Sequence, residues 1–325
     1  MAKNQEKFKT MIGGQALIEG IMMRGPEKDA VVVRTQDGLQ VDVKPRKVYK
    51  KGSLYRWPLI RGVVTFLDSQ VTGVKALMQS ADLSPEEQEE PSKFDQWLEK
   101  KLGSKAFQSL LVSVAVFLGL AMSIGLFFLL PSLAGDVLEI WVGDNLLRYL
   151  LEGVVRISIF VIYIALISRM KDMQRVFAYH GAEHKTIRCY EAGLPLTVEN
   201  IREQTRLHPR CGTSFLLIVM ILSILLFSVT NSLLKMIPVW EQIDGIYDNL
   251  LMMGVKLLLL PLLVGISYEF NRIVGRYDNW LTRVLTAPGM WFQKFTTREP
   301  DDGMIEVAIT AVEAVLPEQE GADRW

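Results

Sequence analysis

Two long apolar stretches without a charged residue stand out in the hydropathy pattern of the chain. Residues 107–130 form a run of 24 uncharged residues that is followed by Pro131, and residues 214–234 form a run of 21. Both exceed the roughly 20 residues that a helix needs to cross a hydrocarbon layer about 30 Å thick. We therefore predict two membrane-spanning helices, the first of which ends at Pro131.

Two further stretches are nearly as apolar but contain isolated charges. Residues 150–167 include Glu152 and Arg156, and residues 250–268 include Lys256. Buried helices of a soluble domain are the alternative interpretation, but the length of these stretches and their position beside the uncharged runs favour four crossings. We expect Glu152 and Arg156, four residues apart, to form an ion pair that serves helix packing rather than transport.

Lys and Arg residues alternate between the segments that join these runs. Residues 169–213 carry eight of them and residues 93–105 carry four, whereas residues 131–145 and 237–249 carry none. Because cytoplasmic loops are rich in Lys and Arg, we predict a plasma-membrane protein with residues 169–213 and both termini in the cytoplasm. Both thiols should be reduced there. The first apolar run begins beyond residue 100, so we expect no cleavable signal peptide.

The N-terminal residues show a different pattern, with two β-rich segments at 29–35 and 39–43. Asp37-Gly38 between them is a strong signal for a hairpin turn. Apolar positions then recur at helical spacing over residues 59–78, which predicts an amphipathic helix that either faces a protein core or lies on anionic lipid. The glycine-rich segment 13–26 is weak evidence for a binding loop.

Together these patterns predict an α-helical integral membrane protein with four transmembrane helices, a small N-terminal cytoplasmic β-containing region and a helical C-terminal segment. The predicted parts are the hairpin region with its amphipathic helix (1–80), an acidic linker and pre-membrane helix (81–105), the four-span membrane domain (106–270) and the cytoplasmic C-terminal segment (271–325), with a helix over 304–316. The lipid bilayer is the expected partner. The predicted architecture is also compatible with a homo-oligomer.

Composition excludes several classes of function. The 36 basic and 36 acidic residues give a net charge of zero, which argues against nucleic acid as a partner, because phosphate binding normally needs an excess of Lys and Arg. Two cysteines are too few for a disulfide scaffold.

Candidate chemistry is concentrated in the segment 169–213. All three histidines and both cysteines of the chain lie between His180 and Cys211, a window of 32 residues. His180 and His184 are four residues apart, so on a helix both imidazoles lie on one face and can share a metal ion. Glu183 lies beside them, where it can act as a general base, as in H-x-x-E-H metallopeptidases. His208 and Cys211 supply further ligands.

Two kinds of metal site remain open at this point. His180, His184, His208 and Cys211 would complete a closed, structural site, whereas three ligands and an open position would make a catalytic one with Glu183 as base. Glu191 is either an alternative ligand or, more simply, a surface glutamate. We expect Cys189 to be buried and to take no part in the site. Glu269, at the cytoplasmic end of the fourth apolar stretch, is a further candidate for the site.

Three motifs together resemble the bacterial YqhQ-like family of membrane proteins of unknown function. They are the glycine-rich segment 13–26, residues 179–186 with the sequence YHGAEHKT, and residues 207–214 with the sequence LHPRCGTS. The resemblance runs through the four apolar stretches to residues 297–302 and covers nearly the whole chain. Its members are described as predicted metal-dependent enzymes, which implies a metal site at the same residues but no substrate.

The expected function is a zinc-dependent hydrolase that acts at the cytoplasmic membrane surface on a lipid or a membrane-protein segment. The ligand types favour zinc as the divalent metal. It would be held by His180, His184, His208 and Cys211, and Glu183 would be the catalytic residue. The alternative is a non-enzymatic assembly or scaffold factor for membrane proteins, in which the metal is structural. A transporter is disfavoured by only four spans and the absence of an internal repeat.

Overall fold

The computed structural model describes residues 7–46, 52–84, 103–143, 146–234, 236–237, 246–319 and 321–324. The chain divides into two units. The first comprises residues 1–84 and 164–325, and the second comprises residues 85–163. Most of the predicted acidic linker and the tip of the last predicted outer loop lie outside the described residues.

The N-terminal region is a four-stranded antiparallel sheet in the order β1-β2-β3-β4. Its strands are β1 (Gly13–Leu17), β2 (Gly20–Arg24), β3 (Lys28–Thr35) and β4 (Gly38–Pro45). The predicted hairpin is confirmed as β3 and β4, and Gly38 after the turn adopts the positive φ of 125° that glycine tolerates. The glycine-rich segment is not a loop, since it forms the first hairpin of the sheet.

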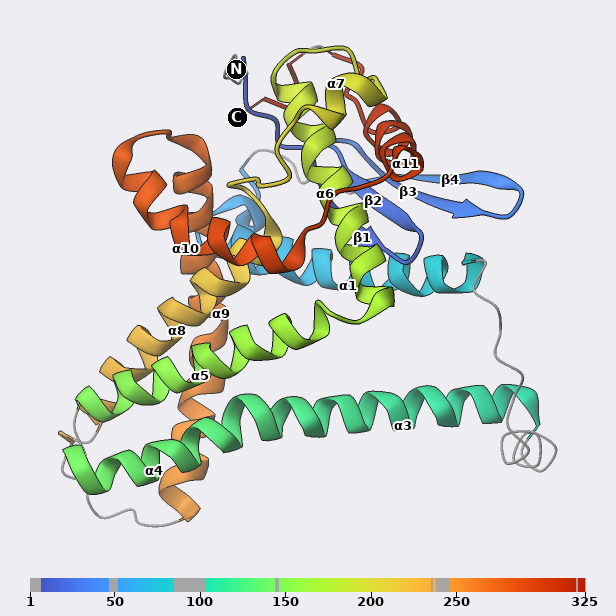
Figure 1. The fold of residues 1–325 in the computed structure, drawn as a ribbon. Helices are drawn as coiled ribbons and strands as arrows, with labels where there is room; N and C mark the ends of the chain where they lie inside the picture. Colours follow the sequence, from blue (N-terminus) through green and yellow to red (C-terminus); the bar gives the residue numbers. More distant parts are fainter. Residues whose placement is uncertain are drawn as a thin grey trace. The chain divides into compact units, whose positions relative to one another are not determined.

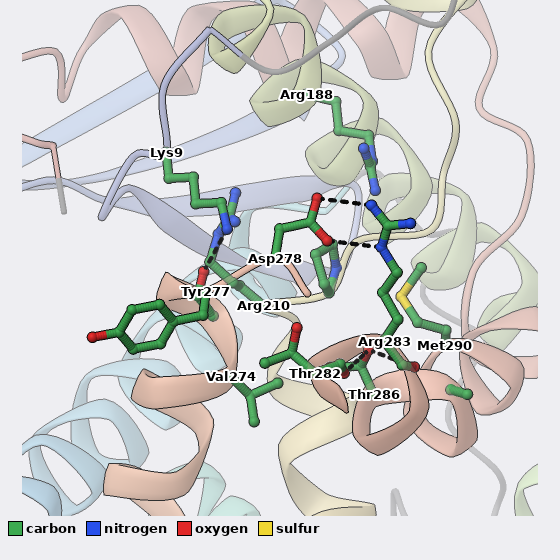
Figure 2. Close-up of a pocket in the computed structure, with 13 residues that line it drawn as sticks. Lys9, Arg188, Arg210, Val274, Tyr277, Asp278, Thr282, Arg283, Thr286 and Met290 are labelled. Atoms are coloured by element: carbon green, nitrogen blue, oxygen red, sulfur yellow. Dashed lines mark hydrogen bonds and ion pairs between the residues drawn. The ribbon is translucent and has the colours of Figure 1, made fainter. Parts of the chain in front are cut away.

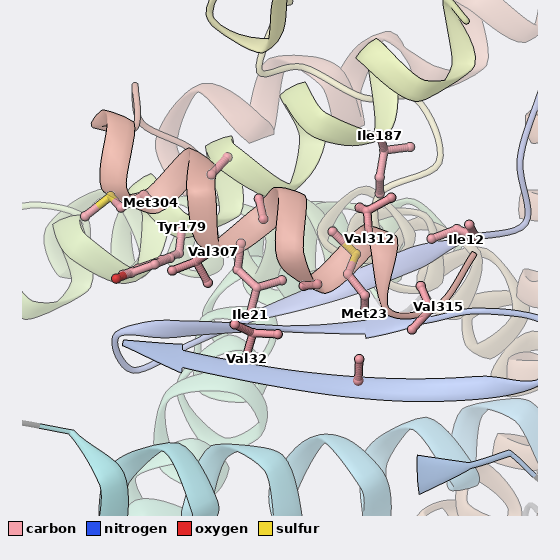
Figure 3. Packing of buried hydrophobic residues seen from close by; sticks show 14 of the residues in the cluster. Ile12, Ile21, Met23, Val32, Tyr179, Ile187, Met304, Val307, Val312 and Val315 are labelled. Atoms are coloured by element: carbon pink, nitrogen blue, oxygen red, sulfur yellow. The ribbon is translucent and has the colours of Figure 1, made fainter. Parts of the chain in front are cut away.

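Helices cover both faces of this sheet (Figure 1). On one face, α6 (Lys171–Glu191) and α11 (Asp302–Glu313) pack on Ile21 and Val32, and Figure 3 shows how Tyr179 and Val307 join this core. The sheet therefore joins segments from both ends of the chain around α6, the helix that carries the H-x-x-E-H motif. The predicted C-terminal helix is confirmed as α11.

The other face of the sheet contacts α1 (Ile60–Leu83), which follows the short 3-10 helix η1 (Leu54–Arg56). The helix is confirmed, but its buried residues are small ones, including Gly73 and Ala76. The larger apolar residues Leu67, Val71 and Val74 are 55–57% exposed. The residues that pack against the core are thus not those of the apolar stripe that predicted the helix.

Within the described residues, four helical segments are long and apolar enough to cross a membrane: Val116–Val142, Leu146–Ile167, Gly212–Leu234 and Leu251–Arg276. Only 6%, 6%, 28% and 22% of their most apolar windows are buried. Such low burial is unlike that of the core helices of a soluble domain, which cover their apolar surface with other parts of the protein. The coarse prediction of a mostly helical protein with four candidate spans is confirmed.

The first candidate span differs from our prediction at its end. Helix α3 (Ser104–Ile124) continues through a π-helical turn, η2 (Gly125–Leu129), into α4 (Leu130–Val142). Pro131 therefore does not end the helix. It lies in the first turn of α4, directly after η2. Proline is tolerated at this position, because the lack of its backbone N–H costs little helical hydrogen bonding there. Residues 131–142, predicted as a loop, are helical.

The other candidate spans are α5 (Leu146–Ile167), α8 (Gly212–Leu234) and most of α9 (Ile246–Arg276). In α5 the predicted ion pair is present, with Arg156 Nη2 at 2.8 Å from Glu152 Oε1. In α9, Glu269 pairs with Arg61 of α1. Glu269 thus has an ion-pair partner on α1.

The segment between α5 and α8 contains α6 and a short helix, α7 (Val198–Arg202). After α9, the amphipathic helix α10 (Trp280–Thr296) begins at a capping box in which Asn279 and Thr282 bond reciprocally to each other's backbone. The extended residues 297–300 then lead to α11, whose cap is the Asp301 side chain, accepting from Met304 N at 2.8 Å.

Candidate metal centre

Three ligand-type side chains meet at α6. His180, His184 and Cys211 each offer one donor atom, and these atoms all lie within 4.8 Å of one another. The two imidazoles lie on one face of the helix, as their spacing predicted, with ring centroids 4.3 Å apart. All three residues are 91% buried or more. The structure thus contains a candidate metal-binding His/His/Cys cluster.

Backbone carbonyls orient both imidazoles. His180 Nδ1 donates to Thr296 O at 2.8 Å, and His184 Nδ1 donates to Arg206 O at 2.6 Å. A proton on Nδ1 leaves a lone pair on Nε2, which is the usual arrangement of metal-binding histidines. His184 Nε2 is buried and makes no hydrogen bond within the described part of the chain. The tautomers that these contacts favour are therefore those needed to bind a cation.

Cys211 enters the cluster from the residue before α8. Its Sγ lies 3.2 Å from His180 Nε2 and 3.1 Å from Thr213 Oγ1. Burial opposes ionisation of the thiol, but the two histidines outweigh it and hold the pKa of Cys211 well below its usual value. Burial likewise opposes charge on His180, but the Cys211 thiolate raises the pKa of His180 to about 9. The Cys211 thiolate and the His180 imidazolium therefore each favour the charged form of the other.

Glu183 lies next to the cluster and is 5% exposed. Its Oε1 accepts from Gly14 N of β1 at 3.0 Å, whereas its Oε2 is buried without a hydrogen-bond partner among the described residues. Burial raises the pKa of Glu183, against the opposing effect of His180 and His184. One oxygen is therefore held in place and the other is available for chemistry.

The glycine-rich segment is part of this site, which the sequence did not reveal. A Cβ on Gly14 would lie 2.7 Å from Met22 O and 3.1 Å from Glu183 Cδ, so only glycine lets β1 approach both β2 and the carboxylate. The nearest sequence signal was the unusual glycine density of residues 13–26, and it carried no information about which side chain the backbone meets.

The C-terminal extended segment also belongs to the site. A Cβ on Gly181 would lie 1.9 Å from Arg298 O, and Arg298 N donates to Phe177 O at 2.8 Å. The glycine between the two histidines of α6 therefore lets residues 296–298 run against the helix. This close approach brings the Thr296 carbonyl to the His180 ring.

His208 has different partners from the other two histidines. Its Nε2 lies 3.3 Å from Glu191 Oε2, and its backbone N donates to Gln293 Oε1 at 2.8 Å. Its ring centroid is 5.6 Å from that of His184. Burial, and then the charge of Arg210, lowers the pKa of His208 well below its ordinary value. The structure brings this neutral histidine beside the cluster without including it in the cluster of ligand atoms.

Glu191 is completely buried, so our interpretation of it as a surface glutamate was wrong. It accepts from Thr10 N at 2.8 Å and forms an ion pair with Arg210. Its role in the described structure is to neutralise Arg210 and orient His208. Cys189 is buried as expected, and burial raises the pKa of its thiol to about 11. It therefore stays protonated and has no place in the cluster.

Comparison with known proteins identifies relatives but no activity. Residues 57–318 match a family model described as a protein of unknown function (DUF1385). The chain is also 30% identical over 321 residues to "Uncharacterized protein YqhQ" of Bacillus subtilis (strain 168), an alignment that covers 96% of this chain and 94% of that protein. No solved structure matches the chain.

Proposed function

The chain belongs to the DUF1385 family of proteins of unknown function, and we propose that it is a membrane-embedded, zinc-dependent hydrolase. His180, His184 and Cys211 hold the metal in this proposal, and Glu183 is the catalytic residue. The substrate is a lipid or a membrane-protein segment that reaches the site from the bilayer.

The arrangement of donor atoms supports a zinc site. Two imidazole nitrogens and one thiolate are ligands that zinc prefers, and catalytic zinc sites take three protein ligands where structural sites take four. Among the described residues, three ligand atoms converge, and the buried, unbonded His184 Nε2 is an acceptor that a cation would satisfy. This three-ligand cluster with a carboxylate beside it is the observation that carries the proposal.

The chain's own groups divide the remaining work. When bound, zinc supplies Lewis-acid polarisation of a carbonyl or phosphoryl oxygen. Glu183 takes a proton from the attacking water on Oε2 and later gives it to the leaving group, while Gly14 N holds Oε1 in place.

The position of the cluster in the chain supports a membrane-associated substrate. Cys211 directly precedes the candidate span Gly212–Leu234, so the ligands lie at the end of a helix that is long enough to cross the bilayer. The excess of Lys and Arg in residues 169–213 favours the cytoplasmic side of the plasma membrane for this end. A lipid or a membrane-protein segment can reach such a site without leaving the membrane.

One observation favours a second function. His180, His184 and Cys211 are 9%, 1% and 5% exposed, which is typical of a closed structural metal site. In that case the protein is a non-enzymatic assembly or scaffold factor, and the metal only fastens α6 to the segment before α8.

Glu183→Gln distinguishes the two functions. In the hydrolase, loss of the general base lowers the rate by about 10²–10⁴-fold, so the variant fails to replace the wild-type gene in a deletion strain. Metal content and thermal unfolding midpoint stay near wild type, because the amide oxygen still accepts from Gly14 N. His184→Ala is the control that loses metal and function in either case. Full complementation by Glu183→Gln at wild-type metal content would refute the hydrolase and favour the scaffold.

A further inference from the structure

Helix α1 turns its larger apolar residues away from the sheet. On the side that contacts the sheet, Gly73 lies against Gln15 of β1, and Ala76 joins the core of this sheet face. Ser69, on the same side, accepts from Arg24 Nη1 at 2.9 Å. The other side carries an apolar stripe, exposed except at one half-buried position, whose members are Ile60, Val64, Leu67, Val71, Val74 and Met78. They recur every three or four positions and therefore share one face of the helix.

The first turn of α1 crosses α9 near the end of a candidate membrane span. A Cβ on Gly62 of α1 would lie 2.7 Å from the Cβ of Tyr268. A Cβ on Gly265 of α9 would lie 2.9 Å from Leu59 O. Glycine at both positions therefore lets the two helices approach each other closely. The ion pair between α1 and α9 lies at the same crossing, so the start of α1 is fixed to the candidate span.

The crossing lies where α9 changes from apolar to polar. Residues 257–268 contain no charged residue, whereas Glu269 and Arg276 follow them. Asp278 and Arg283 then form an ion pair at the start of α10, with Arg283 Nε at 2.8 Å from Asp278 Oδ1, as Figure 2 shows. Charged side chains at the end of an apolar span mark the level of the lipid headgroups. The start of α1 is therefore held at the expected membrane–water interface.

Exposed aromatic and apolar side chains also precede α1. Leu54, Tyr55 and Trp57, in η1 and directly after it, are 53–58% exposed. Tyr and Trp are enriched at the headgroup level of membranes, because their rings are apolar while their O–H and N–H groups can still reach water. These residues adjoin the crossing with α9, so the exposed apolar surface begins where the candidate span ends.

The charge of this part of the chain is strongly positive. Residues 43–67 contain seven Lys and Arg and no Asp or Glu. Two of these cations have carboxylate partners, since Lys44 pairs with Asp42 and Arg61 pairs with Glu269. Subtracting these two from seven leaves an excess of five positive charges. A basic segment next to a membrane span is attracted to the anionic lipids of the cytoplasmic leaflet.

We propose that α1 lies on the cytoplasmic surface of the lipid bilayer, with the apolar stripe inserted between the headgroups and the sheet on the cytoplasmic side. Interfacial amphipathic helices bury their apolar face about 5–10 Å into the boundary between headgroups and acyl chains. The stripe, the exposed aromatic residues, the positive charge and the crossing with α9 all fit this one partner. The proposal depends on the candidate spans but does not rest on the proposed hydrolase function.

Cysteine substitutions at exposed apolar positions provide the test and a matched control. Leu67→Cys, Val71→Cys and Val74→Cys each place one thiol on the apolar stripe. Val41→Cys in β4 is the control, because Val41 is also an exposed β-branched residue. It pairs with Val32 across the β3–β4 ladder, and Val32 belongs to the core beneath α6 and α11. Val41 therefore lies on the sheet face opposite α1, where we expect water.

The measurement is electron spin resonance of a nitroxide attached to each cysteine. The full-length protein is placed in nanodiscs of phosphatidylcholine and phosphatidylglycerol, so that reagents reach both faces of the bilayer. Collision rates are measured with oxygen, which concentrates in hydrocarbon, and with a neutral nickel chelate, which stays in water. We expect the oxygen-to-nickel ratio at the three stripe positions to exceed that at Val41→Cys by about tenfold or more, because only the stripe is immersed in lipid. Cys189 and Cys211 are buried, and the unsubstituted protein measures their residual labelling.

Two other outcomes would overturn the proposal. Nickel collision rates at the stripe as high as those at Val41→Cys would show that the stripe faces water. Low collision rates with both reagents, together with an immobilised label, would show that protein covers the stripe, either a second copy of the chain or another of its helices. Thermal unfolding midpoints near wild type confirm that the variants are folded, and three stripe positions make the result independent of any single substitution.

Discussion

The three histidines of the chain differ in what their ring nitrogens contact. His180 and His184 each direct Nε2 toward the cluster and bond a backbone carbonyl with Nδ1, whereas His208 Nε2 lies beside Glu191. Sequence reasoning treated them as equivalent ligands, because spacing and residue type say nothing about which neighbour a ring meets. Because their contacts differ, mutations of the individual histidines should have different effects on metal binding.

We predict that His184→Ala loses bound metal while His208→Ala keeps it. Removing one of three ligands destroys the chelate, but His208 donates no atom to the cluster. The measurement is metal content per protein by mass spectrometry after purification without added chelator. His208→Ala should lower the unfolding midpoint, since it removes a buried contact to Glu191. If His208→Ala also lost its metal, the site would be the closed four-ligand one that the sequence allowed.

At the scale of elements, the site depends on how closely the extended residues 297–300 approach α6. Arg298 bonds Phe177 O, and its own carbonyl occupies the space that a side chain at Gly181 would need. The neighbouring Thr296 carbonyl receives the His180 N–H. A change in the separation of these two segments should therefore affect both stability and metal binding.

Gly181→Ala tests this contact. The added methyl group meets a backbone oxygen, which cannot rotate away, so we expect a loss of about 1–3 kcal/mol or more in stability and weaker metal binding. Gly254→Ala in α9 is the control, because a Cβ there meets nothing within 4 Å. The unfolding midpoint in detergent and the metal content report the two effects. A midpoint unchanged in Gly181→Ala would show that the two segments are not held as close as described.

At the scale of the whole molecule, the distribution of Lys and Arg determines the expected orientation. Eight of these residues lie in 169–213, and none lies in 131–145 or 237–249. In the part of the chain that the structure describes, four helices are long and apolar enough to cross a membrane. An even number of crossings returns the chain to the side on which it began, so both termini should share the side of the metal cluster.

A reporter fused after Arg206 should therefore be active in the cytoplasm, and one fused at Asp244 should be active outside. The comparison uses paired fusions to an enzyme that works only in the cytoplasm and one that works only after export, normalised to expression level. Asp244 lies outside the described residues, so this experiment tests the charge rule independently of the structure. Finding Arg206 and Asp244 on the same side would refute the four-span topology.

The sequence by itself determined the features that depend on neighbours along the chain. Apolar runs predicted the four candidate spans, Asp37-Gly38 marked the hairpin of β3 and β4, and the spacing of His180 and His184 placed two imidazoles on one helix face. Each of these follows from a local period or a local backbone preference. The end of the first span was predicted wrongly, because a π-turn lets the helix continue past Pro131.

Only the tertiary structure decided which distant groups complete the site. The contact of His180 with Cys211 joins residues 31 apart, that with Thr296 joins residues 116 apart, and that of Glu183 with Gly14 joins residues 169 apart. No local pattern encodes such contacts, since they arise when the sheet, α6 and the C-terminal segment pack into one core. The same packing places His208 beside Glu191, because a buried carboxylate needs hydrogen-bond partners or opposite charges within reach.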